Sequence, residues 1–422
     1  MQTRTARGHR VVITGAGLLT PVGNDVPTTW KALLEGKSGA GPITHFEATD
    51  DYDCRFAAEV KGFDPESVMD RKEARRTDRF AQFAIAAAEE AMQSSGLAGS
   101  LDTLNRDRIG VLIGSGIGGI GTFEEQALVM VQKGPKRISP FFIPMFIPDI
   151  AAGHVSMRYG LRGANYCTVS ACASSAHAVG DAYRLIERGE CDAMVAGGAE
   201  ATVTPMTIAG FGNMKALSTR NDSPETASRP FDATRDGFVL GEGSGVLILE
   251  SLEHALNRGA TILAEIAGYG QSADAYHLTA PAPEGAGAQL AMRAAMKDAG
   301  ASLTDVDYIN AHGTSTPMND LNETLAIKSV FGDHAYQMVV GSTKSMTGHL
   351  LGAAGGLESI ICGLVCQNGV IPPTANFTTP DPACDLNYAH DGKVERKVGL
   401  ALSNSFGFGG HNVCLAVRAF DA

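Results

Sequence analysis

The sequence predicts an α/β fold built from two similar halves, and three observations carry this prediction. Short β-rich runs that end in glycine alternate with longer helical patterns, which is typical of buried sheets layered with helices. The series of β-rich runs begins again in the second part of the chain. Two long helical patterns, rich in alanine and glycine, occupy comparable places in the two series. We therefore expect one half over residues 10–258 and a second over residues 259–422.

Eight runs are the expected strands, four in each half. In the first half they are VVITGAG at 11–17, RIGVLIGSG at 108–116, DAMVAGGAE at 192–200 and GVLILESL at 245–252. In the second half they are AEIAGYG at 264–270, DYINAHGTST at 307–316, MVVGSTKS at 338–345 and NVCLAVRAF at 412–420. Their nearly continuous apolar character predicts strands that are covered on both faces.

Two helical patterns are expected at the centre of the molecule. They are ACASSAHAVGDAYRLIERG at 171–189 and GHLLGAAGGLESIICGLVCQNG at 348–369, and both begin with small residues and stop at a glycine. Small residues let neighbouring backbones come close. If a pseudo-twofold axis relates the halves, the starts of the two helices face one site. Cys172 and His349 stand at those starts.

The composition is that of an ordinary globular chain. Its 422 residues are 44% hydrophobic and 19% charged, and a chain of this length can bury a large core. It has no apolar run of about 18 residues, and its N-terminal segment lacks a signal-peptide core, so we expect a cytoplasmic protein that does not bind membranes. The net charge of -12 argues against nucleic acid as the main partner. The eight cysteines form no CxxC pair, so we expect no zinc site or other metal.

Cys172, in VSACASSAH, is the candidate nucleophile. It lies at the predicted start of a helix, where unpaired N–H groups and the helix dipole favour the thiolate, which is the reactive form of the thiol. Its alanine and serine neighbours leave room for a substrate. The alternative is a small core residue, since free cysteine is often buried, and the local sequence supports both interpretations equally.

Two histidines favour the catalytic interpretation. His312 lies in NAHGTST and His349 in KSMTGH, each after a β-rich run. Sites in α/β folds are built at strand ends. His177, inside the helix that follows Cys172, is expected to be a packed, hydrogen-bonded group and not the catalytic base.

These segments together resemble the motif set of the β-ketoacyl-acyl-carrier-protein synthases, and within that family they are most similar to the elongating type II enzymes. The likeness rests on VSACASSAH, NAHGTST, STKSMTGHLLGAAG and NSFGFGG, with further matches in GGAEATVTP, ASRPFDATRDGFVLGEG and ISPFFIP. The resemblance implies a thiolase-like fold of five alternating layers (αβαβα), made of two duplicated halves. It also implies a homodimer.

The reaction that the resemblance implies is a decarboxylative Claisen condensation in fatty acid chain elongation. An acyl chain moves from acyl carrier protein to Cys172, malonyl-carrier protein loses carbon dioxide, and the resulting enolate attacks the acyl thioester. The phosphopantetheine of the carrier protein holds both substrates, so no separate cofactor is expected. We expect medium to long straight acyl chains.

The resemblance assigns the catalytic roles residue by residue. The backbone N–H groups of Cys172 and Phe408 would bind the oxyanion of acyl transfer. The neutral imidazoles of His312 and His349 would donate hydrogen bonds to the enolate oxygen. Lys344 would pair with Glu358, either as a structural brace or as a direct electrostatic influence on the histidines.

The substrate-binding roles rest on the same resemblance. Thr314 and Thr316 would hydrogen-bond the phosphopantetheine arm, although a hydroxyl-rich turn is the simpler explanation. Ile117, in GSGIGG, would help to limit which acyl chains enter. The apolar run 141–147 would line the acyl tunnel or the dimer interface.

The glycine loop Ser405–Gly410 lacks the spaced lysine of a phosphate-binding loop. By resemblance it is mobile, with Phe408 as a gate between the two half-reactions and Phe406 as a substrate contact. His411 stands where threonine or serine is expected, which puts the hydrogen bonds of this loop in question.

A basic segment is the expected docking surface for the acidic carrier protein. On one helix Arg71, Arg75 and Arg79 would share a face, with Lys72 and Arg76 beside it. Such a patch can steer an acidic partner even on an acidic protein, and a solvated helix face is the alternative. By resemblance Lys215 and Arg220 add to the patch.

Three other functions use similar residues. A ketosynthase of a type II polyketide pathway would have the same site, and its partner enzymes would distinguish it. A chain-length factor is a binding subunit of the same fold, but it would lack the nucleophile, and Cys172 is present. A thiolase would add a second active cysteine in the C-terminal half. Cys414 is the nearest candidate, but it lies in a predicted strand, so this function ranks last.

Overall fold

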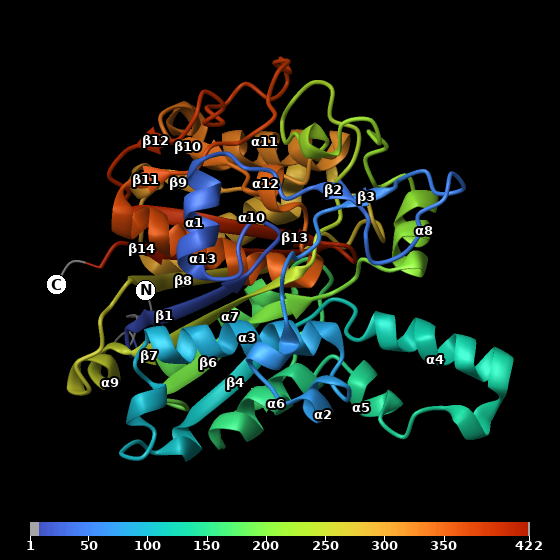
Figure 1. Cartoon of the computed structure of the whole chain (residues 1–422). Coiled ribbons are helices and arrows are strands. Elements are labelled where there is room, and N and C mark those ends of the chain that lie inside the picture. The colour runs from blue at the N-terminus through green and yellow to red at the C-terminus, as the bar shows by residue number, and fades with distance from the viewer. Residues whose placement is uncertain (1–7, 421–422) are drawn as a thin grey trace.

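A continuous ten-stranded sheet forms the centre of the fold (Figure 1). Its two five-stranded halves, called the first and the second sheet below, have the same strand order counted from the middle. The computed structural model describes residues 8–420. Residues 1–7 lie outside this range; they begin the N-terminal segment in which no signal-peptide core was found. Residues 421–422, the last two of the predicted C-terminal half, also lie outside it. The first sheet has the order β1 (Val11–Leu19), β7 (Gly243–Ser251), β6 (Ala193–Glu200), β4 (Ile109–Gly114), β5 (Asn165–Tyr166). The second has the order β8 (Ala264–Ala273), β14 (His411–Arg418), β13 (Leu400–Gly407), β9 (Tyr308–Asn310), β10 (Val339–Gly341).

The strand directions repeat as well. In the first sheet β7 is antiparallel to β1 and β6, whereas β4 is parallel to β6 and β5. In the second sheet β14 is antiparallel to β8 and β13, whereas β9 is parallel to β13 and β10. The two sheets meet where β1 and β8 pair antiparallel. This repetition confirms the two duplicated halves that the sequence predicts.

Helices cover both sheets and fill the space between them, which gives the five predicted layers (Figure 1). The outer face of the first sheet is covered by α3 (Arg79–Ser94) and α6 (Ile150–Tyr159), and that of the second by α10 (Ala286–Ala299) and, beyond it, α11 (Pro317–Phe331). Between the sheets lie α7 (Ser174–Glu187) and α13 (Ala354–Asn368), which contact strands of both.

Small residues make the central layer possible. A Cβ atom added to Gly355 would lie 2.7 Å from the Cβ of Ala176, so α13 can touch α7 only without a side chain there. A Cβ added to Gly356 would lie 2.5 Å from the backbone oxygen of Gly245 in β7. The alanine and glycine content of these helices therefore follows from their close packing.

The remaining elements lie around this core. The helices are α1 (Val26–Leu34), α2 (Arg71–Ala74), α4 (Ile120–Lys133), α5 (Phe142–Phe146), α8 (Pro205–Asn213), α9 (Leu252–Asn257) and α12 (Lys344–Thr347). Two short hairpin pairs are β2 (Gly41–Pro42) with β3 (Phe56–Ala57) and β11 (Val370–Ile371) with β12 (Val394–Glu395). In Figure 1 α4 and α5 project from one side of the body. Within residues 8–420, none of the helices has the length and apolar character needed to cross a membrane.

Some predicted boundaries were wrong in ways that matter for the site. The strand expected over 307–316 ends at Asn310, and the rest is a loop in which Ser315 has a φ of 69°. The strand expected over 338–345 ends at Gly341, because the residues from Lys344 begin α12. In both places the strand is shorter than predicted, and the segment that follows it carries residues of the site.

Candidate active site

Cys172 lies in the tight turn between β5 and α7. Ala171, just before it, has a φ of 50°, in the left-handed region that costs a residue with a side chain about 1–2 kcal/mol. The turn is held by hydrogen bonds from Ala173 N to Ser170 O (3.1 Å) and from Ser174 Oγ to Ala171 O (2.6 Å). This geometry places Cys172 on the wall of a cavity.

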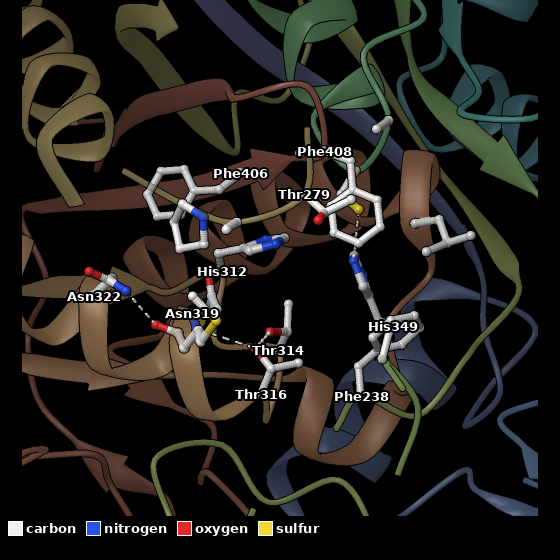
Figure 2. A pocket seen from close by; sticks show the side chains of 18 of the residues that line it. Phe238, Thr279, His312, Thr314, Thr316, Asn319, Asn322, His349, Phe406 and Phe408 are labelled. Carbon is white, nitrogen blue, oxygen red and sulfur yellow. Dashed lines mark hydrogen bonds between the residues drawn. The ribbon is translucent and has the colours of Figure 1, made fainter. Parts of the chain in front are cut away.

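His349 approaches the sulfur from the other half of the chain. Its Nε2 atom lies 3.0 Å from Cys172 Sγ, and Figure 2 shows the imidazole pointing at the sulfur. The residue lies between α12 and α13, and its backbone is fixed by hydrogen bonds to Val239 O (2.7 Å) and from Gly241 N (2.9 Å). The Phe238 ring packs edge-on against the imidazole, with centroids 5.4 Å apart.

His312 supplies the second imidazole from the loop after β9. Glu323, on α11, fixes this loop by accepting hydrogen bonds from the N–H groups of His312 and Gly313, each at 2.8 Å. The rings of His312 and His349 are 5.3 Å apart and nearly perpendicular, at 84°. Cys172 Sγ and a ring nitrogen of each histidine all lie within 4.8 Å of one another.

Burial sets the protonation states of these groups. It lowers the pKa of His312 and His349 well below the ordinary histidine value, and the positive charge of Lys344 lowers both further. Both imidazoles are therefore neutral near pH 7. Burial raises the pKa of the Cys172 thiol to about 12, against the opposing effect of Lys344. Burial thus opposes the stabilising effect of the helix start on the thiolate.

A buried ion pair lies behind the two histidines. Lys344, on α12, contacts the Oε1 atom of Glu358 on α13 through its Nζ atom, and both side chains are almost fully buried. Burial raises the pKa of Glu358 to about 7, and the charge of Lys344 opposes that rise. The pair ties α12 to α13 on either side of His349, so its geometry suits both the structural and the electrostatic role.

Gly407, at the end of β13, brings the glycine loop against the nucleophile turn. A Cβ atom at this position would lie 2.6 Å from Ser170 O and 3.1 Å from Cys172 N. Any side chain would therefore push the loop away from the Cys172 N–H. The sequence pattern did not single out Gly407, and the loop expected from 405 begins later, because β13 continues to Gly407.

Phe406 and Phe408 leave this loop on two sides of the cavity (Figure 2). The Phe406 ring lies 5.6 Å from the His312 ring, and the Phe408 ring lies 6.5 Å from Phe211. Phe406 therefore stands beside His312, whereas Phe408 lies beside Phe211.

His411 opens β14 directly after the glycine loop. Its ring packs edge-on against His177 at 6.3 Å, and His177 Nδ1 hydrogen-bonds with Ser170 Oγ at 2.7 Å. The loop keeps its own hydrogen bond from Gly410 N to Gly407 O at 3.1 Å. His411 thus adds a ring contact beside the nucleophile turn, and the loop closes without a threonine.

The cavity has a volume of about 570 Å³ and holds several further residues of the prediction on its wall. Ile117 lines it together with Cys172, and Lys215 lines it with a side chain that is 74% exposed. Thr314 and Thr316 also line it, and their hydroxyl groups hydrogen-bond with each other at 3.0 Å. Thr316 additionally caps α11, since its hydroxyl accepts a hydrogen bond from the backbone N–H of the third helical residue.

The basic segment does not form the single helix that the spacing predicts. Asp70 caps α2, which ends at Ala74, and Asp78 caps α3, which begins at Arg79. Arg79 is therefore turned inward and pairs with the buried Glu242 at 2.8 Å. The four residues on the outer side are exposed: Arg71, Lys72, Arg75 and Arg76.

The other proposed docking residues have partners of their own. Lys215 pairs with Asp53 at 2.6 Å, and both side chains are exposed. Arg220 lies 3.6 Å from Asp236. The apolar run 141–147 forms α5 and its flanks on the surface beside α4, outside the cavity that holds Cys172.

Comparisons with known proteins agree with this geometry. The model of the beta-ketoacyl synthase N-terminal domain matches residues 8–255, and the model of the beta-ketoacyl synthase C-terminal domain matches residues 263–378. A 3-oxoacyl-[acyl-carrier-protein] synthase 2 of Synechocystis is 53% identical over 412 residues, which cover 98% of each chain. The protein of that name from Staphylococcus aureus strain COL is 53% identical over 417 residues, covering 99% of this chain and all of the relative.

Solved structures show the same fold. A beta-ketoacyl synthase from Burkholderia phymatum has a TM-score of 0.91 at 36% identity, over 98% of this chain and all of that one. A type II polyketide ketosynthase, solved with its acyl-carrier protein and a hexaketide, gives the same TM-score, identity and coverage. The family models and the relatives span both halves and all of the site described above. The chain belongs to the beta-ketoacyl synthase family.

Proposed function

We propose that this protein catalyses the decarboxylative condensation of a Cys172-bound acyl chain with malonyl-acyl-carrier-protein in fatty acid elongation. The observation that carries the proposal is the meeting of Cys172 Sγ, His349 and His312 on the wall of one cavity. Covalent catalysis needs a nucleophile with a base beside it. Decarboxylation needs neutral donors where negative charge develops.

Acyl transfer is the first half-reaction. The sulfur of Cys172 attacks the thioester carbonyl of acyl-carrier protein while its proton passes toward His349 Nε2, 3.0 Å away. The oxyanion forms beside the N–H groups of Cys172 and Phe408, which the fit of Gly407 holds together. The carrier's thiol leaves with a proton, and the acyl group remains on the sulfur.

Condensation is the second half-reaction. The malonyl group loses carbon dioxide, and the electrons of the broken C–C bond form an enolate. Its oxygen accepts hydrogen bonds from His312 and from His349, which for this step carries its proton on Nε2 instead of Nδ1. The enolate carbon then attacks the acyl carbonyl on Cys172. The C–S bond breaks, the β-ketoacyl product stays on the carrier, and the sulfur takes up a proton from water.

The other site residues have supporting roles in this proposal. Thr314 and Thr316 would hold the phosphopantetheine arm, because their hydroxyl groups line the cavity. Phe408 would gate the site between half-reactions, with Phe406 against the substrate. Lys344 with Glu358 would keep the imidazoles neutral and α13 in place.

Carrier-protein docking is proposed for the exposed basic residues around α2. Arg71, Lys72, Arg75 and Arg76 carry positive charge on a surface of an otherwise acidic protein, and Lys215 lines the cavity. Charge complementarity of this kind raises association rates and weakens with salt. Arg75→Glu should therefore raise the KM for the carrier protein at low salt more than at high salt.

A homodimer is proposed on the side where the first sheet ends. β5 is the last strand of that sheet. It contacts α6, which contacts α5, which in turn packs against α4. On α4 and α5 the side chains of Leu128, Val131 and Ile143 are exposed by 59%, 84% and 58%. Exposed apolar side chains in such number mark an interaction surface. Light scattering should give about twice the chain mass of 44.0 kDa.

The fatty acid pathway is favoured over the alternatives. The relatives at 53% identity are named 3-oxoacyl-[acyl-carrier-protein] synthase 2, whereas the polyketide ketosynthase is 36% identical. A chain-length factor would lack the nucleophile, and Cys172 is present. We also propose a cytoplasmic location, because the mechanism needs a reduced thiol, and a boundary between the halves at 258/259, which lies between the two family-model matches.

The proposed function is tested by mass spectrometry after acyl-carrier protein is added, and again after malonyl-carrier protein follows. The acyl mass should appear on the peptide with Cys172 and disappear as β-ketoacyl product forms. Cys172→Ala should abolish acylation, whereas Cys167→Ala, a control at a nearby free cysteine, should keep it. Acylation that survives Cys172→Ala would refute the proposal.

A further inference from the structure

Glu200, the last residue of β6, is a buried carboxylate that the mechanism does not use. Its side chain is fully inaccessible to solvent, and within residues 8–420 no salt bridge reaches it. It accepts four hydrogen bonds: from Ser115 Oγ (2.9 Å) and Ile117 N (3.1 Å) to Oε1, and from Gly116 N (2.7 Å) and Gly352 N (2.9 Å) to Oε2. Three of the four donors are backbone N–H groups, which cannot act as acceptors, so the geometry requires two acceptor oxygens at this place.

These hydrogen bonds join the two halves of the chain. Ser115, Gly116 and Ile117 follow β4 in the first half, whereas Gly352 precedes α13 in the second. The joint is tight, because a Cβ atom on Gly352 would lie 2.3 Å from Gly116 N and 2.5 Å from Glu200 Oε2. One carboxylate therefore fixes two backbone segments against each other.

Both segments form the wall of the cavity next to the nucleophile. Ile117 and Leu351 line it together with Cys172. They also belong to one apolar cluster, in which Phe211 packs as well. An acyl chain on Cys172 needs an apolar wall, and the polar arm is expected on the side of Thr314 and Thr316. The segments held by Glu200 thus lie on the acyl side of the sulfur.

We infer that Glu200 is a positioning residue for acyl-chain selection: it fixes Ile117 and Leu351 across the junction of the two halves. The inference rests on the proposed function, since it names what determines the substrate at that same site. Glu200 does not line the cavity, so its effect on the acyl chain passes through the backbone of Gly116, Ile117 and Gly352.

Glu200→Gln separates this role from simple space filling. A glutamine has one acceptor oxygen and one NH₂ group. With its oxygen toward Gly116 and Gly352, the NH₂ group can still donate to Ser115 Oγ, but the Ile117 N–H loses its acceptor. The opposite orientation would leave both glycine N–H groups without one. The substitution therefore loosens Ile117 selectively and keeps the shape of the side chain.

The experiment compares kcat/KM for acyl-carrier protein that carries a twelve-carbon acyl chain with kcat/KM for the same protein carrying a four-carbon chain. Malonyl-carrier protein is the second substrate. In Glu200→Gln the ratio should rise by about fivefold or more in favour of the long chain, because Ile117 gives way more easily. Decarboxylation of malonyl-carrier protein should change by less than about twofold. Ser115→Ala, which removes one donor to the same carboxylate, should shift the ratio in the same direction and serves if Glu200→Gln does not fold.

Glu250→Gln is the matched control. Glu250 is equally buried, but it pairs with Arg258 and His254 at the far end of β7. Glu250→Gln should leave the ratio of kcat/KM for the long and the short chain unchanged, even if this substitution lowers the melting temperature as much as Glu200→Gln does. A ratio within about twofold of the wild type in Glu200→Gln, or a shift toward the short chain, would overturn the inference. A wild-type protein that does not condense at all would instead refute the proposed function.

Discussion

The turns before α7 and α13 occupy matching places in the two halves but carry different groups. Each has a left-handed residue three positions before the helix: Ala171 with a φ of 50° and Leu351 with a φ of 46°. The next residue is Cys172 in the first half and Gly352 in the second. The duplicated frame therefore repeats, whereas the nucleophile occurs once.

The packing explains this asymmetry. Gly352 lies so close to Gly116 N and Glu200 that no side chain fits, and the second half instead brings its reactive group on His349, before the turn. Cys172 has the space that a side chain needs, on the wall of the cavity. The comparison teaches that one half supplies the nucleophile and the other supplies the imidazoles, and that their close contact depends on glycine.

The largest effect on stability is expected at the Lys344–Glu358 ion pair, which has no counterpart at the matching position of α7. The position in α7 that matches Glu358 is Ala178, a buried alanine. Lys344→Met leaves Glu358 without its partner in the core, which should cost about 3–5 kcal/mol of unfolding free energy. Chemical denaturation measures this loss, and Lys344→Met with Glu358→Gln should recover part of it. A single variant as stable as wild type would show that the pair is not a brace.

The same variant should change the pH dependence. Lys344 lowers the pKa of His312 and His349, so in wild type the condensation rate should hold down to a pH well below the ordinary histidine pKa. In Lys344→Met the acid limb should move to higher pH. The stability of wild type should fall as the pH drops through the ordinary histidine pKa, because the unfolded chain then binds protons that the folded chain does not. An unshifted acid limb would mean that Lys344 does not act on the imidazoles.

Gly352→Ala tests the packing side of the comparison. Its Cβ would meet backbone and carboxylate atoms at 2.3 Å and 2.5 Å, and such overpacking typically costs about 1–3 kcal/mol. Thermal unfolding measures the loss. Gly62→Ala is a useful control for the assay, since nothing surrounds that position, although its own left-handed φ of 67° adds strain. Equal stability of Gly352→Ala and wild type would contradict the close contact between the halves.

Ala171→Gly should have the smallest effect. Glycine adopts the left-handed region freely, so the substitution should change the unfolding free energy by no more than about 1 kcal/mol, in the stabilising direction. It should also lower the acylation rate, because the turn that holds Cys172 becomes less rigid. A marked loss of stability would show that the Ala171 side chain matters more than its backbone.

The sequence predicted the strands that surround the site better than the hydrogen bonds and close contacts that hold its residues in place. Apolar runs identified eight strands, but β13 was missed because its buried residues Ser403, Asn404 and Ser405 are polar. The spacing of the basic residues predicted a single helix, whereas Asp70 and Asp78 cap two separate helices, α2 and α3. Glu200 closes an apolar strand in GGAEATVTP, which is a signal, yet its donors come from residues far apart in the chain.

The division of labour between the halves is tested most directly with His312→Ala. His312 belongs to the half that supplies the imidazoles, and of the two histidines it is His349 that hydrogen-bonds with Cys172 Sγ. The measurement follows, in one sample, the acyl mass on Cys172 and the release of carbon dioxide from malonyl-carrier protein. We expect acylation close to the wild-type rate and a decarboxylation rate that is lower by about 10²- to 10⁴-fold. Equal loss of both steps, or unchanged release of carbon dioxide, would contradict the separation of roles.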